Sequence, residues 1–146
     1  MALIKTICPS QAFGDDTAAV NSVNALAGRG LEGDRYCKLA AEPYEQVTLI
    51  ESEVIDRFNE AVKSTFPYTA FRRNLITEGI RLNELVGQAF YIGEVLLRGH
   101  ELCEPCRSLQ EKLNIDDLVS RLTHKGGLRC EILEGGRISI GDQIRS

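Results

Sequence analysis

The residues of this chain best suited to chemistry are two cysteines, Cys103 and Cys106, separated by two residues. Pro105 and a helical apolar pattern that starts near Ser108 predict that Cys106 lies at or just before a helix start. Free backbone N–H groups there, together with the neighbouring Arg107, favour the thiolate. A thiolate accepts sulfur as a nucleophile or binds a soft metal. The sequence therefore predicts a reactive thiol at Cys106, although C-x-x-C spacing alone fits buried structural thiols equally well.

Two other uses of the cysteine pair fit the sequence less well. A structural zinc site needs two further ligands, and the nearby His100, His124 and Cys130 form no second closely spaced pair. A thioredoxin-like role would place the motif after the first strand of a βαβ unit, whereas here it follows an expected strand at 95–97, late in the chain. A single reactive cysteine with a nearby helper thiol fits best.

A glycine-rich segment lies nearer the amino terminus. Residues 28–33 match the dinucleotide fingerprint G-x-G-x-x-G, but no helical pattern follows at 34–38, so we reject NAD binding. Two interpretations remain open. The segment is a surface loop, or its glycine backbone approaches a ligand closely, with Asp34 and Arg35 aimed inward.

Two adjacent arginines precede Asn74 in the segment Phe71-Arg72-Arg73-Asn74-Leu75. An expected strand and turn follow at 76–80. Guanidinium groups hold phosphate through a planar fork, so this segment suits an anion site. Solvated surface arginines would produce the same pattern. Three further cysteines have no partner at an informative spacing and are interpreted as packing residues: Cys8, Cys37 and Cys130.

Composition limits the classes of protein that need considering. The chain has 146 residues, with 43% hydrophobic and 26% charged residues, which predicts one folded domain over residues 1–146. A net charge of −4 without basic runs argues against nucleic acid. The apolar run at 2–7 is too short for a secretory signal, and no segment is long enough to cross a membrane. Five irregularly spaced cysteines indicate reduced thiols, so we expect a cytoplasmic location.

The expected elements are mainly strands. Residues 3–7, 46–50 and 128–133 have strand composition, and glycine and aspartate at 14–16 indicate a turn. A helix is expected from Ser52, as N-cap, until Pro67 ends any continuation. Two short helices are expected after Cys106, the first with Leu109 and Leu113 on one face. The second carries an apolar stripe that follows Asn114 as its cap: Ile115, Leu118, Val119 and Leu122.

Two stretches of the carboxyl-terminal region share a pattern. Residues 85–96 and 133–144 both follow Leu-x-Gly-x-x-apolar-x-Ile-Gly-acid-x-apolar, which predicts strand, tight turn, strand. We interpret them as two hairpins with convergent turn chemistry rather than as a duplicated domain. They favour a mainly β (α+β) fold, a small barrel with a few short peripheral helices.

Taken together, six segments resemble the MOSC domain in order and spacing across nearly the whole chain. They are Gly30 to Arg35, Gln46 to Glu53, Phe71 to Leu75, Gly87 to Gly93, Cys103 to Cys106 and Gly136 to Asp142. The family is named for the carboxyl-terminal domain of molybdenum-cofactor sulfurases. It also occurs alone, or joined to other domains, in molybdenum-cofactor-dependent reductases.

The resemblance implies a β-barrel and a molybdenum-pyranopterin cofactor. The family's defining cysteine falls on Cys106, which would carry sulfur as a persulfide or ligate the molybdenum. Cys103 is expected beside the cofactor. The family's Arg-x-Asn positions fall on Arg72 and Asn74, and its Gly-Asp-basic loop falls on Gly33, Asp34 and Arg35, which the resemblance therefore makes cofactor-binding residues.

Functional alternatives remain open at this point. The chain lacks the pyridoxal-phosphate lysine domain of full sulfurases, so any sulfur would come from another protein such as a cysteine desulfurase. A reductase of N-hydroxylated compounds would instead need an electron-donor protein. The alternative from a different class is a non-catalytic binding or adaptor module that retains the barrel.

Overall fold

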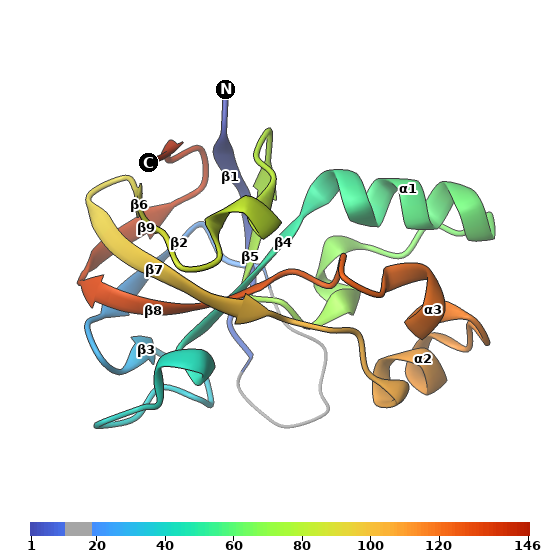
Figure 1. Ribbon diagram of the computed structural model, residues 1–146, viewed down its shortest axis with the longest axis horizontal. Helices are drawn as coiled ribbons and strands as arrows, with labels where there is room; N and C mark the ends of the chain where they lie inside the picture. Colours follow the sequence, from blue (N-terminus) through green and yellow to red (C-terminus); the bar gives the residue numbers. More distant parts are fainter. Residues whose placement is uncertain (11–18) are drawn as a thin grey trace.

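The computed structural model describes residues 1–10 and 19–146, and in these residues ten strands form two sheets (Figure 1). The strands are β1 (Leu3–Ile7), β2 (Ser22–Leu26), β3 (Gly30–Leu31), β4 (Val47–Glu51), β5 (Leu75–Glu78), β6 (Ala89–Ile92), β7 (Val95–Leu102), β8 (Leu128–Glu134), β9 (Gly136–Ser139) and β10 (Ile144–Arg145). The helices are α1 (Ser52–Val62), α2 (Arg107–Leu113) and α3 (Leu118–Leu122), with 3₁₀-helices η1 (Pro43–Glu45), η2 (Tyr68–Phe71) and η3 (Leu82–Leu85).

The larger sheet curls into a nearly closed barrel. Its strand order is β1-β5-β4-β8-β7-β6-β10, and only β4 and β5 within this sheet pair in parallel. The two outer strands meet, because Leu3 bridges Gln143 and the Ile144 N–H donates to the Ala2 carbonyl at 3.0 Å. The smaller sheet, in the order β3-β2-β9, covers part of the barrel wall. The mainly β barrel that the sequence predicted is therefore confirmed.

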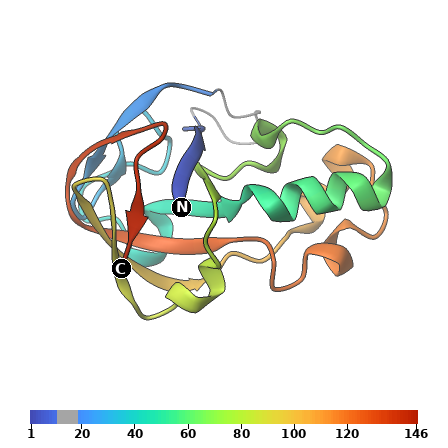
Figure 2. The same cartoon turned by 90° about the horizontal axis from the view of Figure 1, so that it is seen from above.

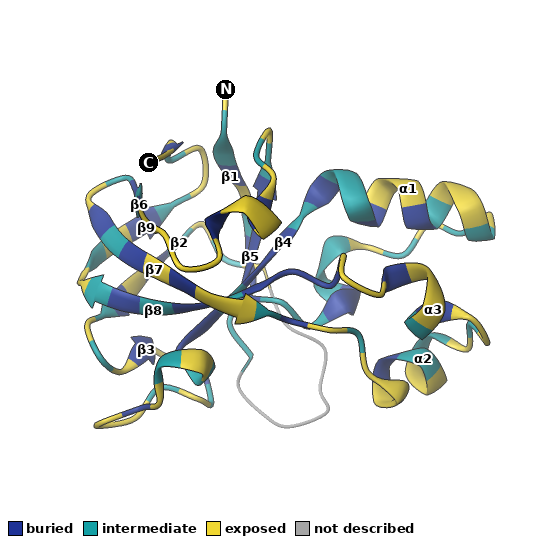
Figure 3. Ribbon diagram, in the orientation of Figure 1, coloured by how far each residue is buried: buried dark blue, intermediate teal, exposed yellow. Residues whose placement is uncertain are grey.

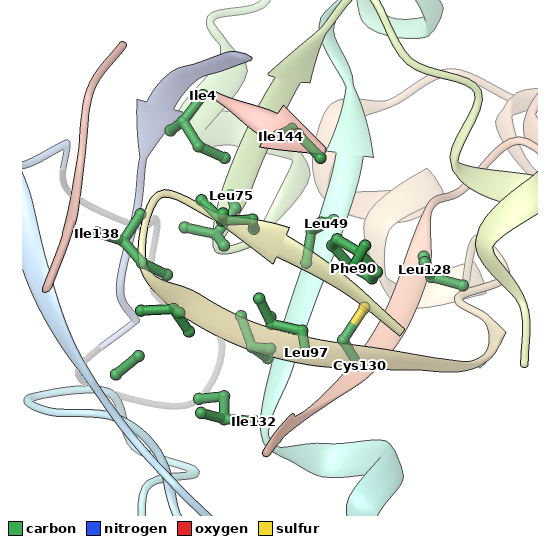
Figure 4. Packing of buried hydrophobic residues seen from close by; sticks show 14 of the residues in the cluster. Ile4, Leu49, Leu75, Phe90, Leu97, Leu128, Cys130, Ile132, Ile138 and Ile144 are labelled. Atoms are coloured by element: carbon green, nitrogen blue, oxygen red, sulfur yellow. The ribbon is translucent and has the colours of Figure 1, made fainter. Parts of the chain in front are cut away.

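The barrel interior is filled by side chains that alternate along the strands. In β7, Val95 and Leu97 are buried while the intervening Leu96 is only partly covered, the period of two that a strand with one core-facing side requires. Figure 4 shows Leu97 among Phe90, Leu49 and residues of other strands, and Val95 belongs to the same cluster. Cys130 belongs to this interior, and burial raises the pKa of its thiol far above the ordinary value.

A second apolar cluster lies outside the barrel, where the three helices gather at one end of the molecule (Figures 1 and 2). Ile55 and Phe58 on α1 follow the three-residue step of one helical face, and they pack with Leu109 of α2 and Leu118 of α3. Figure 3 shows the same helices exposed on their outer faces. No helix in residues 1–10 and 19–146 is long and apolar enough to cross a membrane.

Two sequence predictions need correction, and a third is not tested. Ser52 is the first residue of α1 and Glu51 is its N-cap. Asn114 ends α2 in the left-handed conformation, where its N–H donates to the preceding turn, whereas Asp117 precedes α3. Both errors have one cause, because small polar residues serve either end of a helix. The turn predicted at 14–16 lies outside the described residues.

The repeated pattern gives one hairpin and not two. In the first copy β6 and β7 pair across the turn at Gly93. In the second copy β9 pairs with β2 and β10 pairs with β6, so the chain changes sheet at the turn. The two turns pack on each other, since the Gly93 N–H donates to the Gln143 carbonyl at 2.9 Å. Long-range pairing thus overrides the local turn signal.

Gly127 provides a test of how closely the barrel packs beneath the cysteine motif. Its φ is +112°, and a Cβ there would lie 1.9 Å from the Leu49 carbonyl oxygen, so Gly127→Ala forces backbone to move. We expect a loss of about 3–5 kcal/mol in the free energy of unfolding, measured by denaturant titration. Gly87 is the control, with φ +77° and open space around a Cβ. Gly87→Ala should cost only about 1–2 kcal/mol, and equal losses at both positions would contradict the packing argument.

Candidate functional site

A cleft of about 550 Å³ lies where the ends of β4, β7 and β8 meet the start of α2. It is lined by Ser10, Asp34, Arg35, Tyr36, Tyr44, Glu45, Thr48, Arg72, Arg73, Asn74, Glu101, Cys103, Cys106, Ser108 and Arg129. These residues come from segments far apart in the sequence, so the barrel and the helical end together create the cleft. Its lining contains both cysteines of the C-x-x-C motif and four arginines.

Cys106 is the N-cap of α2, as the sequence predicted, and its side chain is exposed. Cys103, at the end of β7, is only 2% exposed. Of the two cysteines, Cys106 is therefore the thiol that a ligand or a second protein can reach.

The guanidinium group of Arg72 is incompletely satisfied. Its Nε is buried and has no hydrogen-bond partner within the described part of the chain, and Nη1 donates to Ser108 Oγ only at 3.4 Å. Arg72 also adopts a left-handed backbone, with φ +60°. A buried donor without an acceptor is costly, and backbone strain at a non-glycine residue is often kept for a functional reason. The left-handed backbone caps η2, and the unpaired Nε–H leaves a donor for an acceptor supplied by a ligand, close to Ser108.

Asn74 and Asp34 hold one wall of the cleft together. Asn74 Oδ1 accepts from the Thr48 N–H at 3.0 Å and from its hydroxyl at 3.2 Å, while Nδ2 donates to Asp34 Oδ1 at 3.1 Å and to the Cys8 carbonyl at 3.4 Å. The Asp34 carboxylate also accepts from the Ser10 N–H at 2.7 Å. Asn74 thus uses both donors and both acceptor positions within the protein. Its structural task is to join β1, β4 and the 33–36 turn.

Six of the seven residues singled out from the sequence line this cleft: Asp34, Arg35, Arg72, Asn74, Cys103 and Cys106. Gly33 does not line it. Its φ of +90° instead forms the turn that brings Asp34 inward. Arg35 packs over the Tyr36 ring, with its Cζ 4.2 Å from the ring centroid.

Several lining residues were not predicted from the sequence, and among them Thr48, Ser108 and Arg129 carry polar side chains into the cleft lining. Ser108 could have been found, because it follows Cys106 by two positions at the predicted helix start. Arg129 reaches the cleft because β8 pairs with β7, placing it opposite Glu101. That register is set by tertiary pairing and has no local signal.

The other candidate ligands lie elsewhere. His100 Nε2 pairs with Glu131 Oε1 at 3.0 Å, and His124 Nδ1 pairs with Glu104 Oε2 at 2.8 Å. Within the described residues, no three His, Cys, Asp or Glu side chains come together as a metal site. None of the five cysteines, all of which lie in the described part of the chain, forms a disulfide, and burial together with Asp34 raises the pKa of the Cys37 thiol.

A curled, mainly antiparallel barrel with a peripheral Pro-Cys thiol at a helix start defines a MOSC-type domain. The family model for the MOSC domain matches residues 37–145, so the chain belongs to the MOSC domain family. A search of curated proteins found no match.

Solved structures support the same fold. The YuaD protein from Bacillus subtilis has a TM-score of 0.83 at 14% identity, covering 99% of this chain and 94% of that one. YiiM from Geobacillus stearothermophilus has a TM-score of 0.80 at 20% identity, covering 99% and 74%. YiiM from Escherichia coli has a TM-score of 0.75 at 21% identity, covering 99% and 69%. At these identities the likeness establishes the fold.

The Asn74 network yields a stability prediction. Asn74→Ala removes the acceptor of the Thr48 N–H and one of the donors to the Asp34 carboxylate, so we expect a loss of about 2–4 kcal/mol in the free energy of unfolding. Asn24 is the control, since it is exposed and accepts only from Arg137 at 3.3 Å. Asn24→Ala should change stability by about 0.5 kcal/mol or less. Thermal or denaturant unfolding measures both, and similar small effects would show that Asn74 does not hold the wall.

Proposed function

We propose that the cleft binds a molybdenum-pyranopterin, with the Cys106 thiolate as the protein's ligand to the metal. The MOSC family is associated with the molybdenum cofactor. The observation that carries the proposal is that an exposed thiol and an unsatisfied arginine, Arg72, line one cleft. A thiolate suits a soft metal, and a guanidinium suits phosphate.

The residues present fit such a group. Arg72 has a buried Nε–H without an acceptor, next to the Ser108 hydroxyl, and together they would hold a phosphate oxygen. Arg129 on β8 adds a further positive charge to the cleft. Glu101 on β7 balances it in part, since Arg129 Nε lies 4.0 Å from Glu101 Oε1. A cleft of about 550 Å³ is within the range of small-molecule cofactor sites. When bound, the cofactor would supply two-electron redox chemistry. The protein's own contribution would be to bind, orient and partly shield it.

Metal and pterin content test the proposal directly. After reconstitution with molybdenum cofactor, we expect wild type to retain metal and pterin in equal amounts. Cys106→Ser should retain less than about one tenth of the metal, because it removes the soft ligand. Arg72→Gln should weaken pterin retention, because a neutral amide replaces the guanidinium.

Cys37→Ser is the matched control, since Cys37 is partly exposed and does not line the cleft. It should retain wild-type metal and pterin. Equal, negligible retention in wild type and Cys106→Ser would reject the ligand role.

A second role for Cys106 is supported by its exposure, which would let another protein reach the thiol. In this role the Cys106 thiolate attacks the outer sulfur of a cysteine desulfurase persulfide. A new S–S bond forms on Cys106, the old one breaks, and the desulfurase cysteine leaves as a thiolate. The nearby guanidinium groups would stabilise the anionic persulfide.

Mass spectrometry distinguishes this carrier role. Incubation with a cysteine desulfurase and cysteine should add one sulfur atom to the peptide containing Cys106 and none to the peptide containing Cys37. The burial-raised pKa of Cys37 makes it the poorer nucleophile. Absence of the added sulfur on Cys106 would reject sulfur carriage.

The alternative is a non-catalytic binding module. This alternative would hold if Cys106 carried neither metal nor sulfur and the protein, supplied with an electron donor, did not reduce N-hydroxylated compounds.

We further propose a cytoplasmic location, with which cysteines that form no disulfide agree.

A further inference from the structure

The segment that carries Cys106 is attached to a second loop, residues 123–127, which precedes β8. The Cys103 N–H donates to the Gly127 carbonyl at 2.8 Å. Gly126 packs so closely that a Cβ there would lie 2.2 Å from the Cys103 carbonyl oxygen and 3.0 Å from the Pro105 nitrogen. The two loops therefore touch backbone to backbone.

Glu104 and His124 join the same two loops through side chains. Glu104 Oε1 accepts from the His124 backbone N–H at 2.7 Å, and Oε2 pairs with His124 Nδ1 at 2.8 Å. These bonds hold the pKa of Glu104 below its ordinary value, with the backbone N–H as the largest cause. His124 is held in a left-handed conformation, φ +62°, and its carbonyl accepts from Asn83 Nδ2 at 2.8 Å.

Arg73 bridges the two loops from the side of the cleft. Its Nε donates to the Gly126 carbonyl at 2.8 Å, and its Nη2 donates to the Glu104 carbonyl at 3.3 Å. Arg73 therefore differs from the adjacent Arg72, whose Nε has no acceptor in the described chain. The two arginines have separate tasks, one directed to the protein backbone and one available to a ligand.

We infer that Glu104, His124 and Arg73 are positioning residues that fix the Cys106 thiol relative to the cleft arginines. This inference rests on the proposed role of Cys106 as the working thiol. The link acts on geometry and adds little stability, because Glu104 and His124 are exposed and exposed ion pairs contribute little. Cys106 lies two residues beyond Glu104, so loss of the Glu104 side-chain contacts loosens the support of the thiol while the backbone contacts to Gly126 and Gly127 remain.

The chain offers a matched control pair. His100 and Glu131 form a comparable contact, at 3.0 Å, between β7 and β8. Neither residue lines the cleft. His100→Asn and Glu131→Gln therefore remove a similar surface pair and leave the Cys106 segment untouched.

Alkylation of Cys106 by an anionic and a neutral reagent tests the inference without any cofactor. In wild type, we expect iodoacetate to be favoured over iodoacetamide relative to a free cysteine peptide, because the cleft arginines attract the anion. The quantity measured is the rate of Cys106 alkylation by iodoacetate divided by its rate with iodoacetamide. In Glu104→Ala and His124→Asn this ratio should fall by at least about threefold. His124→Asn keeps the backbone N–H and tolerates a positive φ, so it removes only the ring contact.

A conservative variant of Glu104 separates a positioning role from a general structural effect. Glu104→Gln keeps an oxygen that accepts from the His124 N–H and should restore most of the ratio lost in Glu104→Ala. The control variants should keep the wild-type ratio, and thermal unfolding should place all variants near wild type. An unchanged ratio in both Glu104→Ala and His124→Asn would overturn the inference.

The failures of the two proposals remain distinguishable. If the alkylation ratio falls in the variants but the wild-type protein carries no metal, pterin or sulfur, only the proposed function is rejected. If wild-type Cys106 carries metal or sulfur but the alkylation ratio is unchanged in the variants, only the positioning role is rejected.

Discussion

The carboxamide of Asn74 is the interaction on which the cleft depends. It joins Thr48 of β4, the Cys8 carbonyl after β1 and the buried carboxylate of Asp34, so three separate segments share one side chain. Buried polar groups are tolerated only when they are satisfied, and here each one satisfies another. This wall of the cleft is consequently fixed by polar contacts and not by the apolar interior of the barrel.

The Cys106 thiol has a different kind of support from the Asn74 wall. Cys106 stands on a seven-residue helix that packs through Leu109 on the outer apolar cluster and not on the barrel core. Its position depends on polar contacts to the loop before β8. The division agrees with a common arrangement in proteins, in which a rigid scaffold presents working groups on its connecting segments. Arg72 combines both roles, since a constrained backbone carries a side chain with unused hydrogen-bonding capacity.

Features with a local cause could be predicted from the sequence. The strand at β1, the hairpin of β6 and β7, and the helix start at Cys106 follow from periodicity and turn chemistry. The second hairpin was wrong, because β9 and β10 find partners in different sheets. The same limit applies to the cleft. Its cysteine and arginine segments were noted from their residue types and assigned to one site by family resemblance, whereas Arg129 and the link between Glu104 and His124 depend on contacts between distant segments.

The meeting of β1 with the residues before β10 has a consequence for how the domain can be connected to others. The Ala2 carbonyl and the Ile144 N–H share a hydrogen bond, so the chain enters and leaves the barrel at neighbouring points (Figure 1). Both points lie away from α2 in the two ribbon views (Figures 1 and 2). A domain with adjacent ends can be inserted into a host protein, or have its ends tied by a short linker, with little distortion. Any covalent neighbour would then attach at an edge away from α2, whose start contributes Ser108 to the cleft lining.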